Sequence, residues 1–93
     1  MKLRAVEGWV IVEPIKEGTR NGVVMPYAYR EMGLAKVLSV GMQRDKYGKQ
    51  FKPLINAGDK VIHEPYVGQE FEFEGRELLA LPYEDVYGVV YRD

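Results

Sequence analysis

Cysteine is absent from the 93 residues, and His63 is the single histidine. Without cysteine the chain has no disulfide, no thiolate nucleophile and no cysteine ligand for a metal, so packing alone must hold the fold together. A metal site could draw only on this histidine and on carboxylates, and we predict none. A lone histidine near a strand end indicates a structural role, with a pH-sensitive contact as the alternative.

Aliphatic side-chain hydroxyls are equally scarce, since Thr19 and Ser39 are the only threonine and serine. Neither stands beside a histidine in a recognisable nucleophile motif, and no glycine pattern matches a phosphate-binding loop. The row of Glu70, Glu72 and Glu74 alternates with apolar residues, which places it on the solvent face of a strand rather than in an acid–base pair. We therefore expect no enzyme activity and no cofactor.

Neither an excess of one charge nor a long apolar run is present. Thirteen basic residues stand against fourteen acidic ones, a net charge of −1. This balance gives no general attraction to nucleic acid or to an anionic membrane. The segment Met1-Lys2-Leu3-Arg4 resembles neither a signal peptide nor a transit peptide. We expect a soluble, cytoplasmic protein.

Short strands dominate what is present. Trp9-Val10-Ile11-Val12 is apolar on both faces, as a buried strand would be, and similar runs are expected at 37–40 and 60–63. Residues 70–74 alternate glutamate with phenylalanine, and Gly75 permits a tight turn, so residues 69–81 are expected to form a hairpin. A turn at 82–85 leads into a last strand from 86 to 91. No window shows helical periodicity over three turns, so we predict one all-β domain over 1–93, a small irregular barrel.

Two segments do not fit core strands. Residues 16–34 combine glycines, a proline and charges without a sustained period. Within them Val23-Val24-Met25 could be a core strand or an exposed apolar contact; the flanking Gly22 and Pro26 favour an exposed loop. Residues 42–53 are suited to an exposed hairpin that turns near Tyr47-Gly48.

Taken in register, these pieces resemble the chaperonin-10, or GroES-type, family of co-chaperonins along nearly the whole chain. Gly22-Val23-Val24-Met25-Pro26 is similar to the family's mobile-loop signature, and Tyr47-Gly48-Lys49 lies where the family has its roof hairpin. The further matching segments are Lys2-Leu3-Arg4 with Val10-Ile11-Val12, Lys36 to Gly41, Gly58-Asp59-Lys60-Val61, Tyr66 with Gly68 and Glu70, Glu74 to Leu79, and Glu84 to Val90.

The resemblance implies a seven-membered dome that caps a nucleotide-bound chaperonin-60 ring and encloses client proteins while they fold. It implies a mobile loop over 16–34 and a roof hairpin over 42–53. The residue roles that it implies are chaperonin binding by Val23, Val24 and Met25, loop flexibility from Gly18 and Gly22, a subunit interface of Leu3 with Val89 and Val90, a roof of Lys46, Tyr47, Gly48 and Lys49, and a cavity-facing Tyr66.

The sequence also departs from the family pattern. The first strand carries Ala5-Val6-Glu7-Gly8-Trp9 in place of the usual proline-leucine pair, and the loop region is shorter and contains Tyr27 and Tyr29. The roof hairpin is basic, so we expect a roof that is open or that binds an anion. A divergent member, such as one carried by a bacteriophage, would fit these differences.

The sequence is also compatible with two other classes of protein. Aromatic residues interleaved with bases, as in Lys46-Tyr47 and Tyr29-Arg30, would suit a small barrel that binds single-stranded nucleic acid. A barrel like the catalytic domain of medium-chain alcohol dehydrogenases is the third possibility, but the chain lacks cysteine ligands for zinc and a cofactor domain.

Overall fold

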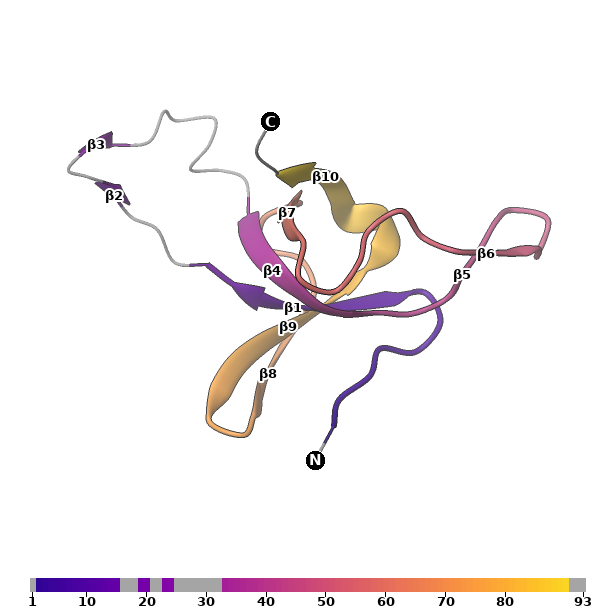
Figure 1. Cartoon of the computed structure of the whole chain (residues 1–93), viewed down its shortest axis with the longest axis horizontal. Coiled ribbons are helices and arrows are strands. Elements are labelled where there is room, and N and C mark those ends of the chain that lie inside the picture. Colours follow the sequence, from indigo (N-terminus) through magenta and orange to yellow (C-terminus); the bar gives the residue numbers. More distant parts are fainter. Residues whose placement is uncertain (1, 16–18, 21–22, 25–32, 91–93) are drawn as a thin grey trace.

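A six-stranded antiparallel sheet in the order β10-β7-β4-β1-β9-β8 forms the body of the molecule (Figure 1). The computed structural model describes residues 2–15, 19–20, 23–24 and 33–90. Two small two-stranded sheets, β2-β3 and β5-β6, lie outside the body. The strands are β1 (Trp9–Pro14), β2 (Thr19–Arg20), β3 (Val23–Val24), β4 (Gly33–Val40), β5 (Gln43–Arg44), β6 (Gln50–Phe51), β7 (Lys60–His63), β8 (Gln69–Phe73), β9 (Arg76–Pro82) and β10 (Val86–Val90).

The prediction of an all-β class is confirmed, and the strand bounds other than those of β4 are close to those expected. A 3-10 turn, η1 (Tyr83–Asp85), lies where the sequence indicated a turn before the last strand. The Phe71 and Phe73 side chains are half-buried while Glu70 and Glu72 are exposed, as the alternation predicted. The hairpin between β8 and β9 turns at Glu74 and Gly75, both with positive φ, which glycine adopts without steric cost.

Strand β4 is longer than the sequence indicated. It begins at Gly33 rather than near Val37, so Gly33 and Leu34 belong to the sheet and not to the predicted 16–34 loop region. The cause is pairing on both sides: β4 lies between β1 and β7, with Gly33 opposite His63. Main-chain hydrogen bonds to two neighbours order a stretch whose side chains show no strand pattern.

The main core lies on one face of the bent sheet. Val10 and Val12 from β1 meet Leu79 and Leu81 from β9, and Val37 from β4 completes the centre. Alternate residues of a strand point to opposite faces, so Ile11 and Leu78 instead form a second, smaller cluster with Ala5 on the other face. The central strand β1 is therefore apolar on both sides, as its sequence predicted. The remaining residues of the main cluster are Ala35, Ile55 and Val61.

Backbone contacts hold the first residues onto this sheet. The Ala5 amide donates a hydrogen bond to Ser39 Oγ at 2.9 Å, and the Gly41 amide donates to the Trp9 carbonyl at 2.9 Å. A Cβ at Gly41 would come within 1.9 Å of the Val6 carbonyl oxygen. This close approach requires glycine, and it fixes the N-terminal segment beside the start of the 42–53 hairpin.

Candidate functional site

The first excursion, the segment of residues 16–32 between β1 and β4, begins and ends where these two strands are still paired; we call this paired end its closed base. Pro14 lies opposite Ala35 in the β1-β4 ladder. Just beyond it, the Ile15 amide donates to the Leu34 carbonyl at 2.8 Å. Because the ladder continues to the point where the chain departs, residues 16–32 are an insertion into a completed pair of strands.

An ion pair between β1 and β9 lies next to this closed base. Arg76, at the start of β9, donates from Nε to Glu13 Oε2 at 3.0 Å and from Nη2 to Oε1. The hydrogen bonds from Arg76 hold the pKa of the Glu13 carboxyl below its usual range, and those same bonds raise the pKa of the guanidinium. The two residues are 63 positions apart, so no local pattern in the sequence could have indicated this pair.

The predicted chaperonin-binding triplet lies only partly within the described residues. Val23 and Val24 form β3, which pairs with Arg20 and Thr19 of β2 in a two-stranded sheet apart from the body. In Figure 1 this small sheet stands well away from the main sheet, at the end opposite β5 and β6. Met25, Gly18 and Gly22 lie outside the described residues.

The second excursion is the predicted hairpin of residues 42–53, formed by β5 and β6. Asp45 organises its turn: Oδ1 accepts hydrogen bonds from the Tyr47 and Lys49 amides, both at 2.9 Å. The Asp45 main chain pairs with Lys49 and Gly48 across the turn. Gly48 has a φ of 82°, the left-handed conformation that glycine favours. The turn is thus rigidly defined although its residues are exposed.

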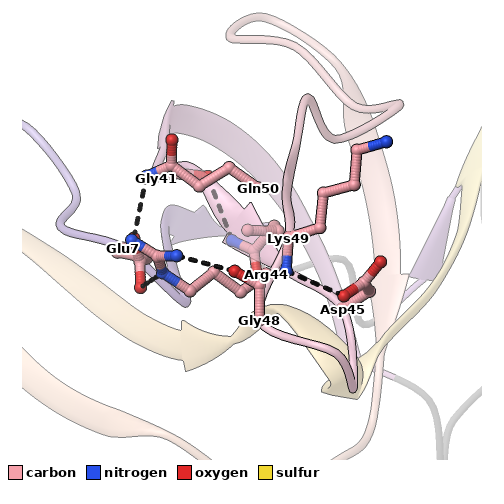
Figure 2. Close-up of polar contacts among 8 residues, drawn as sticks. Glu7, Gly41, Arg44, Asp45, Gly48, Lys49 and Gln50 are labelled. Carbon is pink, nitrogen blue, oxygen red and sulfur yellow. Dashed lines mark hydrogen bonds and ion pairs between the residues drawn. The ribbon is translucent and has the colours of Figure 1, made fainter.

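Hydrogen bonds connect the N-terminal segment to both strands of this hairpin (Figure 2). Glu7 accepts from Arg44 Nε at 2.8 Å and from Gln50 Nε2 at 3.3 Å. Arg44 also donates to the Gly48 carbonyl at 2.7 Å. The hydrogen bond from Arg44, followed by that from Gln50, lowers the pKa of the Glu7 carboxyl. Sequence reasoning did not identify Glu7, because its partners are 37 and 43 residues away.

The four predicted roof residues lie together at the tip of the hairpin. Lys46, Tyr47, Gly48 and Lys49 are all exposed, and Tyr47 retains 82% of its accessible surface. The Lys46 ammonium stands 5.2 Å from the centroid of the Tyr47 ring, within cation–π range. The tip presents an aromatic ring and lysines to solvent.

The two edges of the six-stranded sheet differ in character. β8 exposes Glu70 and Glu72, whereas β10 is the uncharged run Val86–Val90. Charged side chains protect an edge from pairing with another chain, and an uncharged edge is open to it. In β10, Val89 packs against the main core and Val90 remains 47% exposed.

The other predicted interface residue, Leu3, packs within its own chain. Its half-buried side chain contacts the second cluster around Ile11 and Leu78. The N-terminal segment and β10 lie on opposite sides of the molecule in Figure 1. The structure does not bring Leu3 together with Val89 and Val90 inside one chain.

Tyr66, the predicted cavity-facing residue, is fully exposed. Its backbone has a φ of 63°, which a residue with a side chain adopts at an energetic cost. The turn that holds it includes Gly68, whose φ is 91° and whose missing Cβ would lie 2.7 Å from the Ala80 carbonyl oxygen. The turn is therefore held against β9 with the tyrosine directed away from the protein.

The residues that could carry catalysis are used structurally. Ser39 Oγ accepts from the Ala5 amide, and His63 is 5% exposed with Nδ1 2.8 Å from the Glu64 carbonyl. Within the described ranges, no three histidine or acidic side chains cluster as metal ligands would. No helix in the same residues is long and apolar enough to cross a bilayer.

Comparison with known proteins agrees with this arrangement. The model of the family described as "Chaperonin 10 Kd subunit" matches residues 2–90. The co-chaperonin GroES of Clostridioides difficile strain 630 is 36% identical, over 97% of this chain and 99% of the relative. The co-chaperonin GroES of Clostridium botulinum strain Hall is 33% identical, over 97% and 98%.

Nothing in these matches favours a nucleic-acid-binding barrel, and the family consists of chaperones without enzymatic activity. The family match and both relatives extend over nearly the whole chain, including the two excursions and the strands that carry them. The chain therefore belongs to the chaperonin-10 family, and it is a co-chaperonin.

Proposed function

We propose that seven copies form a dome that caps a chaperonin-60 ring in its nucleotide-bound state and encloses client proteins in the cytoplasm while they fold. Val23, Val24 and Met25 make the contact with the chaperonin, and Gly18 and Gly22 give the free loop its flexibility. The observation that carries this proposal is the closed base of the excursion: the Ile15–Leu34 hydrogen bond completes the β1-β4 pair before residues 16–32 begin.

The location of β3 supports an interaction role for the apolar triplet. Val23 and Val24 belong to a small sheet apart from the main one, so their strand is not part of the ladder of the main sheet. Burying two valines and a methionine yields roughly 5–8 kcal/mol, while ordering each loop residue costs on the order of 1–2 kcal/mol. One loop then binds weakly, and a ring of loops binds well by avidity.

The joint between subunits is proposed to use the uncharged edge of β10. Residues near Leu3 of one copy would pair with the main chain at Val89 and Val90 of the next, which would cover that edge. Two observations support this pairing: β10 lacks the charges that protect β8, and the N-terminal segment lies far from β10 of its own chain. Tyr66, exposed on its rigid turn, would face the enclosed chamber.

A nucleotide-dependent pull-down tests the assignment. The bait is the chaperonin-60 of Clostridioides difficile, the organism whose co-chaperonin is 36% identical to this chain. Wild type should bind with nucleotide and not without it, and Met25→Asp should abolish binding. Tyr47→Asp is the matched control, because it puts the same charge on an exposed aromatic residue of the 42–53 hairpin.

Sedimentation of all three proteins must first show the same assembly, so that a loss of binding reports on the loop. Equal binding by wild type and Met25→Asp would overturn the loop assignment. A monomer in place of a ring near seven times 10.7 kDa would overturn the heptamer.

A further inference from the structure

Charge is separated between the hairpin of residues 42–53 and the rest of the chain. The hairpin carries Arg44, Lys46, Lys49 and Lys52 against one acidic residue, Asp45, a net charge of +3. Since the whole chain carries −1, the other residues carry −4. The near-neutral net charge of the chain is thus the sum of a basic hairpin and an acidic remainder.

The structure assigns two of these five charges to internal contacts. Arg44 is paired with Glu7 and also donates to the Gly48 carbonyl. Asp45 Oδ1 accepts from two amides of its own turn. Glu7 is thus taken up by Arg44, and the carboxylate of Asp45 is directed at its own backbone rather than at the lysines.

The three lysines of the hairpin have no acidic partner among the residues that the structure describes. Within the described part of the chain, no carboxylate lies within ion-pair distance of Lys46, Lys49 or Lys52. Lys46 contacts the ring of Tyr47, an uncharged neighbour. Because Asp45 and Gly48 define the turn that carries Lys46 and Lys49, little backbone order has to be gained there when a ligand binds.

We propose that the hairpin tips bind a compact, multivalent phosphate anion, with inorganic polyphosphate as the chemical class, and that the site is complete only where several copies bring their tips together. This inference rests on the ring proposed above. A single exposed tip holds an anion weakly in water. Tips that converge repel one another, and an anion that bridges them removes that repulsion while it gains from several tips at once.

The chemistry of the tip favours a phosphate chain over a nucleic acid. Lysine binds phosphate as a point charge without reading a base, and the arginine that could form a planar contact is held by Glu7. A long polymer would also have to pass the acidic body, whereas a short chain stays at the tips.

The test is calorimetric titration of the assembled protein with short-chain inorganic polyphosphate, with orthophosphate and with oligothymidylate of equal phosphate number. We expect polyphosphate to bind most tightly, and its affinity to fall as salt is raised. The double variant Lys46→Gln/Lys49→Gln should lose about tenfold or more, as expected when charge-assisted hydrogen bonds are removed. The matched control Lys36→Gln/Lys60→Gln removes the same charge from the sheet and should bind like wild type.

Three results would overturn the inference: equal affinity of the two double variants, tighter binding of oligothymidylate than of polyphosphate, or unchanged binding by a monomeric form. The chaperonin pull-down is a separate measurement. If the protein binds chaperonin-60 but does not bind polyphosphate, only this inference is overturned. If it does not bind chaperonin-60 in the pull-down, the result counts against the proposed function.

Discussion

The imidazole ring of His63 lies so close over Gly33 that a Cβ on the glycine would come within 2.1 Å of Cε1. The two residues face each other across β4 and β7. The ring is buried, with Nδ1 at 2.8 Å from the Glu64 carbonyl. The single histidine is thus a packing residue at the point where the chain re-enters the sheet from the first excursion.

Gly33→Ala should destabilise the protein by about 1–3 kcal/mol, the usual cost of overpacking. Urea unfolding measures the change. Gly88→Ala is the matched control, because its Cβ would meet Ile62 side-chain atoms at an ordinary 3.6 Å. If the ring is the obstacle, Gly33→Ala/His63→Ala should lose less stability than the two single changes combined. Strict additivity would contradict the contact.

The stabilising effect of the Glu13–Arg76 pair should depend on pH. The pKa of Glu13 is lower in the folded protein because Arg76 donates to its carboxylate, so the unfolded chain takes up the proton first. The contribution is therefore complete above the ordinary glutamate pKa of about 4.3 and is lost as the pH falls through the lowered value. Glu13→Gln should reduce stability at neutral pH, and the difference from wild type should shrink in acid.

Urea midpoints measured from neutral pH down to about pH 3 test this linkage. Arg76→Gln should reproduce the Glu13→Gln profile, because either change removes the same pair. Combining them should add little further loss. A constant difference across the whole pH range would mean that the ion pair is not its source.

Asp45→Ala should loosen the tip of the 42–53 hairpin without unfolding the domain. The amides of Tyr47 and Lys49 donate hydrogen bonds to Asp45 Oδ1, and in the variant they lose this acceptor. Their hydrogen exchange should therefore accelerate several-fold. Asp45→Asn should largely restore protection, because its amide oxygen can accept the same bonds. Slow exchange in the alanine variant would show that the carboxylate does not order the turn.

Leu81→Ala should be the most damaging leucine truncation in the main core. Leu81 is fully buried, and deleting such a side chain costs about 2–5 kcal/mol through lost burial and the cavity left behind. Leu54→Ala is the matched control, since Leu54 is 90% exposed and should change stability by no more than about 0.5 kcal/mol. Thermal unfolding compares them. A large loss from Leu54→Ala would reveal that this leucine is covered in the assembled protein.

Patterns within one strand could be predicted from the sequence because they depend on local periodicity. The alternation around Phe71 and Phe73 predicted both a strand and its buried face, and the apolar run at Val10 predicted a central strand. The start of β4 at Gly33 could not be predicted in this way. Its order comes from β1 and β7, which are distant in sequence.

Polar contacts between residues far apart in the sequence are the second kind of feature that could not be predicted. Glu7 braces Arg44, and Glu13 meets Arg76, because the folded sheet brings their strands together. Glutamates and arginines are common, so their number and spacing do not identify partners. The basic character of the hairpin could be predicted, but not that its arginine is paired with Glu7 from the N-terminal segment.

The closed pair of strands at the base of the first excursion also has an evolutionary consequence. Since Pro14 and Ile15 already meet Ala35 and Leu34, the sheet needs no information from residues 16–32 to find its register. If that segment binds the chaperonin as proposed, its length and sequence can change under selection for recognition while the paired strands keep their register. A co-chaperonin built this way can follow a diverging partner without a change in the register of its sheet.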